Sequence, residues 1–179
     1  DPNAAKPAAL WRRFTLVERQ EASQKAMAAL DKVMQNARPS VPATKEVVVV
    51  GAGLAGISAA TQFIAAGVDI ALLERSNTAG GVWRSYGNAF SRVNSTEPGY
   101  RLRLKRRPMP NSNHSHFHEI LTDVELAFEQ FSLADVTFLE MGLVGVARLV
   151  PSASWRLCCV GRCSRRVSLE WEWASLCTN

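Results

Sequence analysis

The sequence predicts an α/β fold: a parallel sheet of the Rossmann-like type, preceded by one helix and followed by an irregular C-terminal tail. Four valines at 47–50 form a β-branched run that is typical of a buried strand. An alanine-rich stretch at 54–66 predicts a helix, and the apolar run 68–73, which ends at Glu74, predicts a second strand. A strand, a glycine-rich turn, a helix and a second strand form one β-turn-α-β unit.

The turn between the first strand and the helix carries the glycines of a dinucleotide-binding fingerprint. Gly51 permits the sharp turn, Gly53 lets a pyrophosphate approach the backbone, and Gly56 lets the helix pack against the strand. At Leu54 and Ala55 the helix begins, so its free N–H groups and positive dipole end face a diphosphate. We therefore predict a dinucleotide site at this turn.

Glu74 stands about 20 residues after the turn, at the predicted end of the second strand. Its carboxylate can accept hydrogen bonds from a ribose and repels a 2′-phosphate, so the site favours FAD or NAD over NADP. Two alternatives stay open. One is a tight glycine turn without a ligand; the other is a membrane span, because no charged residue lies between Glu46 and Asp69.

The residues after Glu74 connect the chain to a family. They include a second glycine pair followed by a tryptophan, in the order Arg75, then Gly80, Gly81, Val82 and Trp83. Over 47–146 the sequence resembles the flavin-dependent oxidoreductases. Gly-Gly-x-Trp is similar to the flavin-containing monooxygenases and their Baeyer–Villiger relatives, whereas the amine-oxidase branch usually has Arg where this chain has Val82.

The resemblance implies an oxidoreductase that binds FAD through the glycine turn, Glu74, Arg75 and the segment 80–83. In the full-length family, NADPH and dioxygen support oxygenation of a nitrogen, a sulfur or a ketone. The stretch after Trp83 lies along the flavin in that family, and Asn94 resembles its active-site Asn, the alternative being an ordinary turn residue. The sequence shows no second GxGxxG and so no NADPH site.

We therefore expect the N-terminal FAD-binding portion of a monooxygenase, incomplete and inactive by itself. Two alternatives stay open: another FAD oxidoreductase such as an amine oxidase, and a truncated non-catalytic nucleotide-binding module. The domain is expected at 45–150. Residues 1–44 would be a helix at 15–37, either a surface helix or a docking helix, and a proline-containing linker.

Two clusters between Trp83 and the third strand invite functional interpretations. Five basic residues within 101–107 suggest a phosphate or partner site, a short edge strand, or simply a solvated loop. His114, His116 and His118 raise the possibility of a metal site, although they lie at the start of a predicted helix over 113–131, and we predict no metal. Asn113 or Ser115 is the expected cap of that helix.

The last part of the chain is predicted least well. Residues 135–139 suggest the third parallel strand and 143–150 another strand, whereas 151–179 form an unassigned tail, for which disorder stays open. All four cysteines lie in this tail, without the spacing of a zinc site. We expect a cytoplasmic protein that acts on a small molecule, without nucleic acid or a membrane span; its oligomeric state and substrate stay open.

Overall fold

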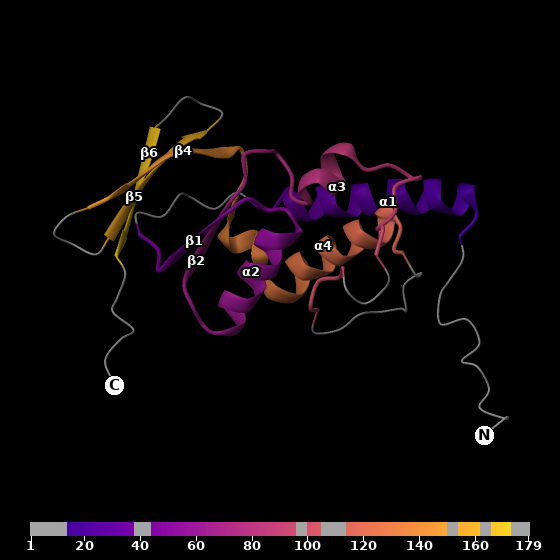
Figure 1. Cartoon of the computed structure of the whole chain (residues 1–179), viewed down its shortest axis with the longest axis horizontal. Helices are drawn as coiled ribbons and strands as arrows, with labels where there is room; N and C mark the ends of the chain where they lie inside the picture. Colours follow the sequence, from indigo (N-terminus) through magenta and orange to yellow (C-terminus); the bar gives the residue numbers. More distant parts are fainter. Residues whose placement is uncertain are drawn as a thin grey trace, which may run out of the picture.

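The computed structural model describes residues 14–37, 44–95, 100–104, 114–149, 154–161 and 166–172. Figure 1 shows a helical layer and two sheets. Along the chain the elements are α1 (Leu16–Met34), β1 (Val47–Val50), α2 (Leu54–Ala65), β2 (Ile70–Leu73), α3 (Gly81–Tyr86), α4 (Phe117–Phe131), the 3-10 helix η1 (Leu133–Val136), β3 (Thr137–Phe138), β4 (Met141–Arg148), β5 (Ser154–Gly161) and β6 (Arg166–Glu172).

The predicted parallel sheet is present, in the order β1-β2-β3. All four residues of β2 are buried, whereas β1 is partly exposed and Val50 is 51% exposed. The expected burial on both faces is partly confirmed, since Val47 and Val49 pack against one hydrophobic cluster and Val48 against the other. No valine of the run is fully buried, and among the described strands β1 pairs with β2 alone. The third strand is shorter than predicted, since Leu133–Val136 forms a 3-10 helix before it.

Helices α2 and α4 and the inner face of α1 share one hydrophobic core with one side of β2. The helix predicted over 113–131 is present as α4, and its spacing of apolar residues produces a buried face: Phe117, Ile120, Val124 and Phe128 are each at most 1% exposed. The expected cap is wrong, because His116 occupies the N-cap position instead of Ser115, and Asn113 lies outside the described residues. The Glu119 carboxylate accepts the His116 backbone N–H at 2.8 Å and so completes the first turn.

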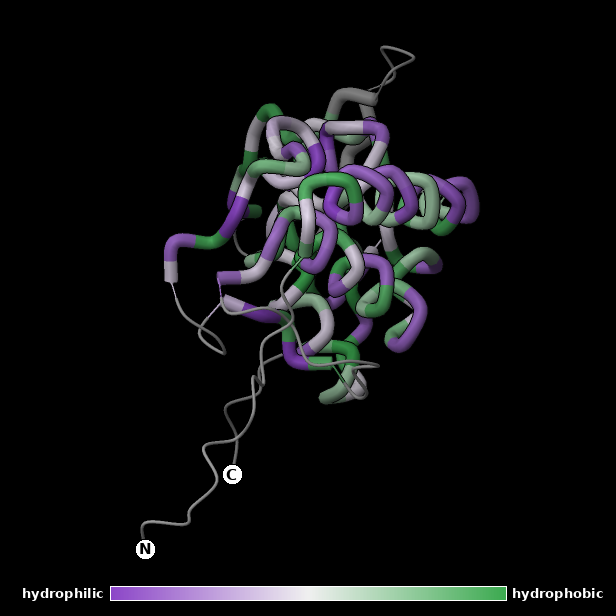
Figure 2. Tube along the Cα trace, turned by 90° about the vertical axis from the view of Figure 1, so that its right-hand side faces the viewer, coloured by the Kyte–Doolittle hydropathy of each residue, from purple (hydrophilic) through white to green (hydrophobic). Residues whose placement is uncertain are grey.

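Helix α1 lies beside α4 (Figure 1). Its first turn is closed by a capping box, in which Thr15 and Glu18 exchange side-chain and backbone hydrogen bonds. Leu30 and Met34 are buried, whereas Leu16 is 40% exposed, and the small residues Ser23 and Ala26 occupy the remaining buried positions of the helix. In the hydropathy view of Figure 2, hydrophilic and hydrophobic stretches alternate along the described chain, as expected for helices with one buried side.

Strands β4, β5 and β6 form a second, antiparallel sheet. This corrects the expectation of an irregular tail after residue 150. In β5, Leu157 and Cys159 are buried whereas Arg156 and Cys158 are exposed. Two adjacent cysteines hide this alternation in the sequence, because one faces the core and the other faces solvent. The buried residues pack with Leu73 and Phe138 on the other side of the parallel sheet.

Within the part of the chain that the structure describes, no helix has the length and apolar character needed to cross a membrane. The same residues contain no group of three or more His, Cys, Asp or Glu side chains placed to hold a metal ion.

Candidate nucleotide site

The glycine turn follows β1 directly, as predicted. Gly51 has φ of +96°, a conformation that favours glycine, and its N–H donates to the Leu73 carbonyl at 2.7 Å. A Cβ on Gly56 would lie only 1.8 Å from the Gly51 carbonyl oxygen. The fold itself therefore requires glycine at both positions, whether or not a ligand binds.

Gly53 has a different surrounding. It has φ of −78° and ψ of 178°, which any residue adopts, and a Cβ there would meet nothing closer than the Gly81 Cα at 3.8 Å. Gly53 is the N-cap of α2, whose first backbone N–H groups have no intrahelical partner. The chain's own packing does not explain the glycine, which leaves room for a ligand at the start of α2.

Glu74 is 7% exposed and lies at the end of β2. Its Oε2 accepts the Ala52 N–H at 2.7 Å, and its Oε1 accepts the Ser76 N–H at 2.8 Å. The carboxylate thus joins the glycine turn to the loop after β2, a structural role that sequence reasoning did not foresee. Each carboxylate oxygen has further acceptor capacity, so hydrogen bonds from a ribose remain compatible with this geometry.

The second glycine pair meets the first. The Gly80 N–H donates to the Ala52 carbonyl at 2.8 Å, and a Cβ on Gly81 would lie 2.9 Å from the Gly53 Cα. Gly80 and Gly81 both have positive φ, and they open the short helix α3, which the sequence did not reveal. Arg75 and Val82 are exposed beside these turns.

Trp83 has a partner that the sequence analysis missed. Its indole Nε1 donates to the phenol oxygen of Tyr100 at 3.0 Å, and the two ring centroids are 6.0 Å apart. No spacing rule relates these residues, because the irregular chain after α3 brings them together.

Asn94 is exposed and follows a segment that pairs with the start of α4. The Val93 N–H donates to the Ser115 carbonyl at 2.9 Å, and the Phe117 N–H donates to the Ser91 carbonyl at 3.0 Å. These bonds place the backbone of Asn94 relative to α4.

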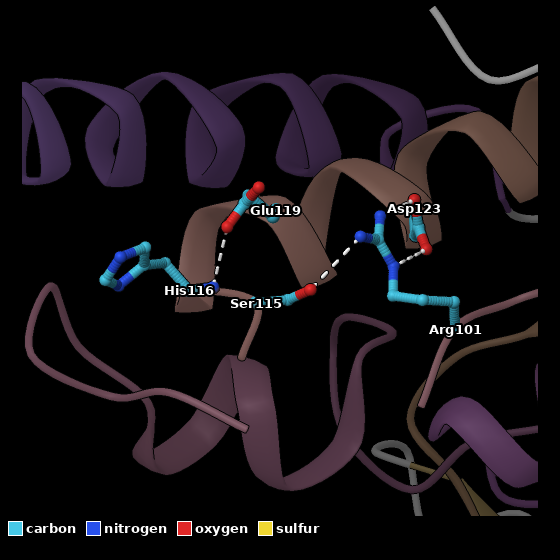
Figure 3. A network of polar contacts seen from close by, with 5 residues as sticks. All are labelled: Arg101, Ser115, His116, Glu119 and Asp123. Atoms are coloured by element: carbon cyan, nitrogen blue, oxygen red, sulfur yellow. Dashed lines mark hydrogen bonds and ion pairs between the residues drawn. The ribbon is translucent and has the colours of Figure 1, made fainter. Parts of the chain in front are cut away.

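At Arg101 the structure corrects the interpretation of the basic cluster as a solvated loop, whereas Arg103 is exposed as that interpretation expects. Its side chain is 3% exposed and pairs with Asp123 of α4, which is 2% exposed (Figure 3). The neighbouring Leu102 is buried as well, and the described residues of this segment form no strand. Residues 105–107 lie outside the described residues.

A cavity of about 440 Å³ lies between the end of α1, the loop after β2 and the turn after β3. The turn is held next to Glu74, because the Met141 N–H donates to the Glu74 carbonyl at 2.7 Å. Arg84 of α3 closes one side by binding both carboxylate oxygens of Asp31 at 2.9 and 3.0 Å.

Two of the three histidines form an aromatic cluster. The buried rings of His116 and His118 stack with centroids 5.8 Å apart, and Phe14 meets both edge-on. Burial, followed by the nearby positive charge of Arg92, lowers the pKa of His116 to about 4. The rings contribute to packing between α4 and the residue preceding the α1 cap.

Part of the chain matches a known family, and the fold is similar to that of solved structures. Residues 46–120 match the family model described as FAD dependent oxidoreductase. Among solved structures, a steroid monooxygenase bound to NADP has 21% identity and a TM-score of 0.59, over 70% of this chain and 25% of its own. A polycyclic ketone monooxygenase from Thermothelomyces thermophila has 17% identity and a TM-score of 0.57, over 88% and 31%.

An S-allyl-L-cysteine S-oxygenase from Allium sativum has 15% identity and a TM-score of 0.52, over 71% of this chain and 34% of its own. These likenesses show the fold, and the chain spans about a quarter to a third of the length of the structures that it matches. No curated protein matches the chain.

Proposed function

We propose that this chain binds FAD and is the FAD-binding portion of a flavin-dependent monooxygenase. The observation that carries the proposal is the convergence of Gly53, Glu74 and Gly81 around the open start of α2. Gly53 has no packing reason to be glycine, and a pyrophosphate that approaches the backbone supplies one. The family match over 46–120 includes all three residues and supports FAD as the dinucleotide.

The residues of the site bind and orient the cofactor. In this proposal, the N–H groups of Leu54 and Ala55 and the dipole of α2 hold the diphosphate. Glu74 accepts from the ribose while it fixes the turn through Ala52. In this proposal, the base occupies the cavity next to the loop after β2, whose lining combines amide, hydroxyl and apolar groups with the charged side chains of Asp31, Arg84 and Glu140.

Bound FAD supplies the redox chemistry and the reaction with dioxygen. Trp83 and Asn94 would then face the ring portion of the cofactor, Trp83 as a wall and Asn94 as an amide donor or acceptor. The solved structures of this fold include ketone monooxygenases and an S-oxygenase. We propose the same class of oxygenation for the full-length protein, without a choice between nitrogen, sulfur and ketone substrates.

NADPH has no evident site in this chain. The sequence contains a single GxGxxG, and the carboxylate of Glu74 repels a 2′-phosphate. We propose that the chain by itself binds FAD weakly and does not oxidise NADPH.

The test is a visible absorption spectrum of the purified chain with and without added FAD, followed by addition of NADPH in air. Retained or added flavin on the protein, with no NADPH loss above the free-flavin control, supports the proposal. Turnover of amines with dioxygen and without NADPH would indicate another FAD oxidoreductase. Nucleotide binding without any flavin binding would indicate a non-catalytic nucleotide-binding module.

A further inference from the structure

Ser115 is the point where two separate loop segments meet the start of α4. Its carbonyl oxygen accepts the Val93 N–H at 2.9 Å, and its hydroxyl oxygen accepts from Nη1 of Arg101 at 3.2 Å. Ser115 is fully buried. The two residues that bind Ser115 each have a neighbour of interest in the sequence: Asn94 follows Val93, and Tyr100 precedes Arg101.

Arg101 holds its segment with a two-pronged contact. Its Nε donates to Oδ2 of Asp123 at 2.6 Å and its Nη2 donates to Oδ1 at 2.5 Å (Figure 3). Two parallel bonds fix the plane of the guanidinium group as well as its distance. With Nη1 on Ser115, the side chain connects the loop to two positions on or next to α4.

This anchoring determines where Tyr100 lies. Leu102, which follows Arg101, is 6% exposed and belongs to the main core. Arg101 and Leu102 together therefore hold the backbone directly after Tyr100. The phenol oxygen of Tyr100 then accepts the Trp83 indole N–H at 3.0 Å. The buried ion pair between Arg101 and Asp123 is therefore connected, through Tyr100, to Trp83 of α3.

A buried ion pair is not by itself a strong source of stability, because desolvation of both charges offsets much of their attraction. The two parallel bonds between Arg101 and Asp123 nevertheless restrict the loop that carries Arg101 to one position relative to α4. In the proposed function, the ribose lies at Glu74, the diphosphate lies at the N-terminus of α2, and Trp83 of α3 faces the ring end of the cofactor. Tyr100 and Asn94 each follow or precede an anchored residue in the chain, and Tyr100 bonds to Trp83.

We propose that Arg101 is a positioning residue for the ring end of the cofactor: through Asp123 and Ser115 it fixes Tyr100, the hydrogen-bond partner of Trp83, while Ser115 also holds Val93, which precedes Asn94. The inference rests on the proposed function, since it assumes a flavin dinucleotide in the site. It assigns Arg101 no contact with the adenosine end of the cofactor.

The test compares two ligands on the full chain. ADP occupies only the diphosphate and adenosine positions, whereas FAD also reaches the ring end. Arg101→Lys keeps the charge and loses the fork. Ser115→Ala removes one acceptor only. Arg103→Lys, an exposed residue of the same segment, is the matched control.

For Arg101→Lys and Ser115→Ala we expect FAD affinity to fall by about one tenfold step, ADP affinity to stay at the parental value, and the visible band of bound flavin to shift. Arg103→Lys should match the parent with both ligands. Should Arg101→Lys fail to fold, Ser115→Ala decides the matter alone.

Parental FAD affinity in a folded Ser115→Ala variant would overturn the inference, as would equal losses for ADP and FAD. A parent chain that binds neither ligand would instead overturn the proposed function, and the positioning role with it. The two failures are therefore distinguishable by the parent's own titration.

Discussion

The carboxylate of Glu74 accepts the backbone N–H of Ala52 at 2.7 Å, although 22 positions separate the two residues. The acid that sequence reasoning assigned to a ribose therefore also holds the glycine turn against the end of β2. Its second oxygen accepts the Ser76 N–H at 2.8 Å, so the turn and the following loop share one buried anchor.

Replacing Glu74 should therefore reduce stability even without nucleotide. Glu74→Ala leaves two backbone N–H groups without their acceptor, and each such loss costs about 1–3 kcal/mol. Glu74→Gln keeps one carbonyl oxygen and should lose less. Urea unfolding measures both, with the exposed Glu129→Ala as the control that should equal the parent. A Glu74→Ala chain as stable as the parent would refute the anchoring role.

The buried face of α4 gives a second prediction. Phe128 is 1% exposed within the main core, whereas its neighbour Glu129 is exposed. Phe128→Ala should lower the free energy of unfolding by about 3–5 kcal/mol, because it removes apolar contacts and leaves a cavity. Glu129→Ala should change it by less than about 0.5 kcal/mol. Equal melting temperatures for the two variants would contradict the face assignment.

The histidine cluster predicts a loss of stability in mild acid. His116 has a pKa of about 4 in the folded chain against 6.5 ordinarily, because it is buried and near Arg92 and Arg19; Glu119 opposes the shift. Between these values the unfolded chain binds a proton that the folded chain does not, so stability falls as pH falls through that window. From about pH 7.5 to about pH 5 the loss is about 2 kcal/mol from this residue.

Unfolding of the parent and of His116→Asn at both pH values checks this. Asn suits an N-cap and does not titrate, so the variant should lose less stability on acidification. An identical pH dependence for the two chains would show that His116 is not the titrating group.

Local sequence patterns were sufficient to predict the helices and strands whose formation depends mainly on their own residues. The valine run forms a strand, the glycines form the turn that follows it, and 117–131 forms a helix, as predicted, although the valines are less buried than expected. The placement of Glu74 at the end of β2 follows from the same unit. The hydrogen bond from the Ala52 N–H to Glu74 could not be predicted, because the spacing of residues in the sequence does not indicate that one carboxylate has two roles.

The misjudged features depend on contacts between distant segments. Arg101 belongs to a basic run that suggested solvent exposure, yet Asp123 neutralises it in the interior. Tyr100 reaches Trp83 through an irregular loop, and no periodicity predicts such a path. In β5, the paired cysteines concealed an alternating strand whose burial depends on the other sheet. Tertiary packing supplied all three.

The central claim, a dinucleotide at the glycine turn, is tested most directly by comparing Gly53→Ala with Gly56→Ala. A Cβ on Gly53 meets no atom of the chain within ordinary contact distance except Gly81 Cα at 3.8 Å, whereas a Cβ on Gly56 lies 1.8 Å from the Gly51 carbonyl. Gly56→Ala should thus destabilise the fold itself, and Gly53→Ala should not.

The decisive measurement is the affinity of the Gly53→Ala chain for ADP and FAD, by calorimetric and fluorescence titration at a temperature where it is folded. We expect a parental melting temperature together with a loss of at least about tenfold in affinity for both ligands, because the methyl group occupies the path of the diphosphate. A Gly53→Ala chain that binds ADP and FAD as tightly as the parent would show that no diphosphate approaches the backbone at Gly53.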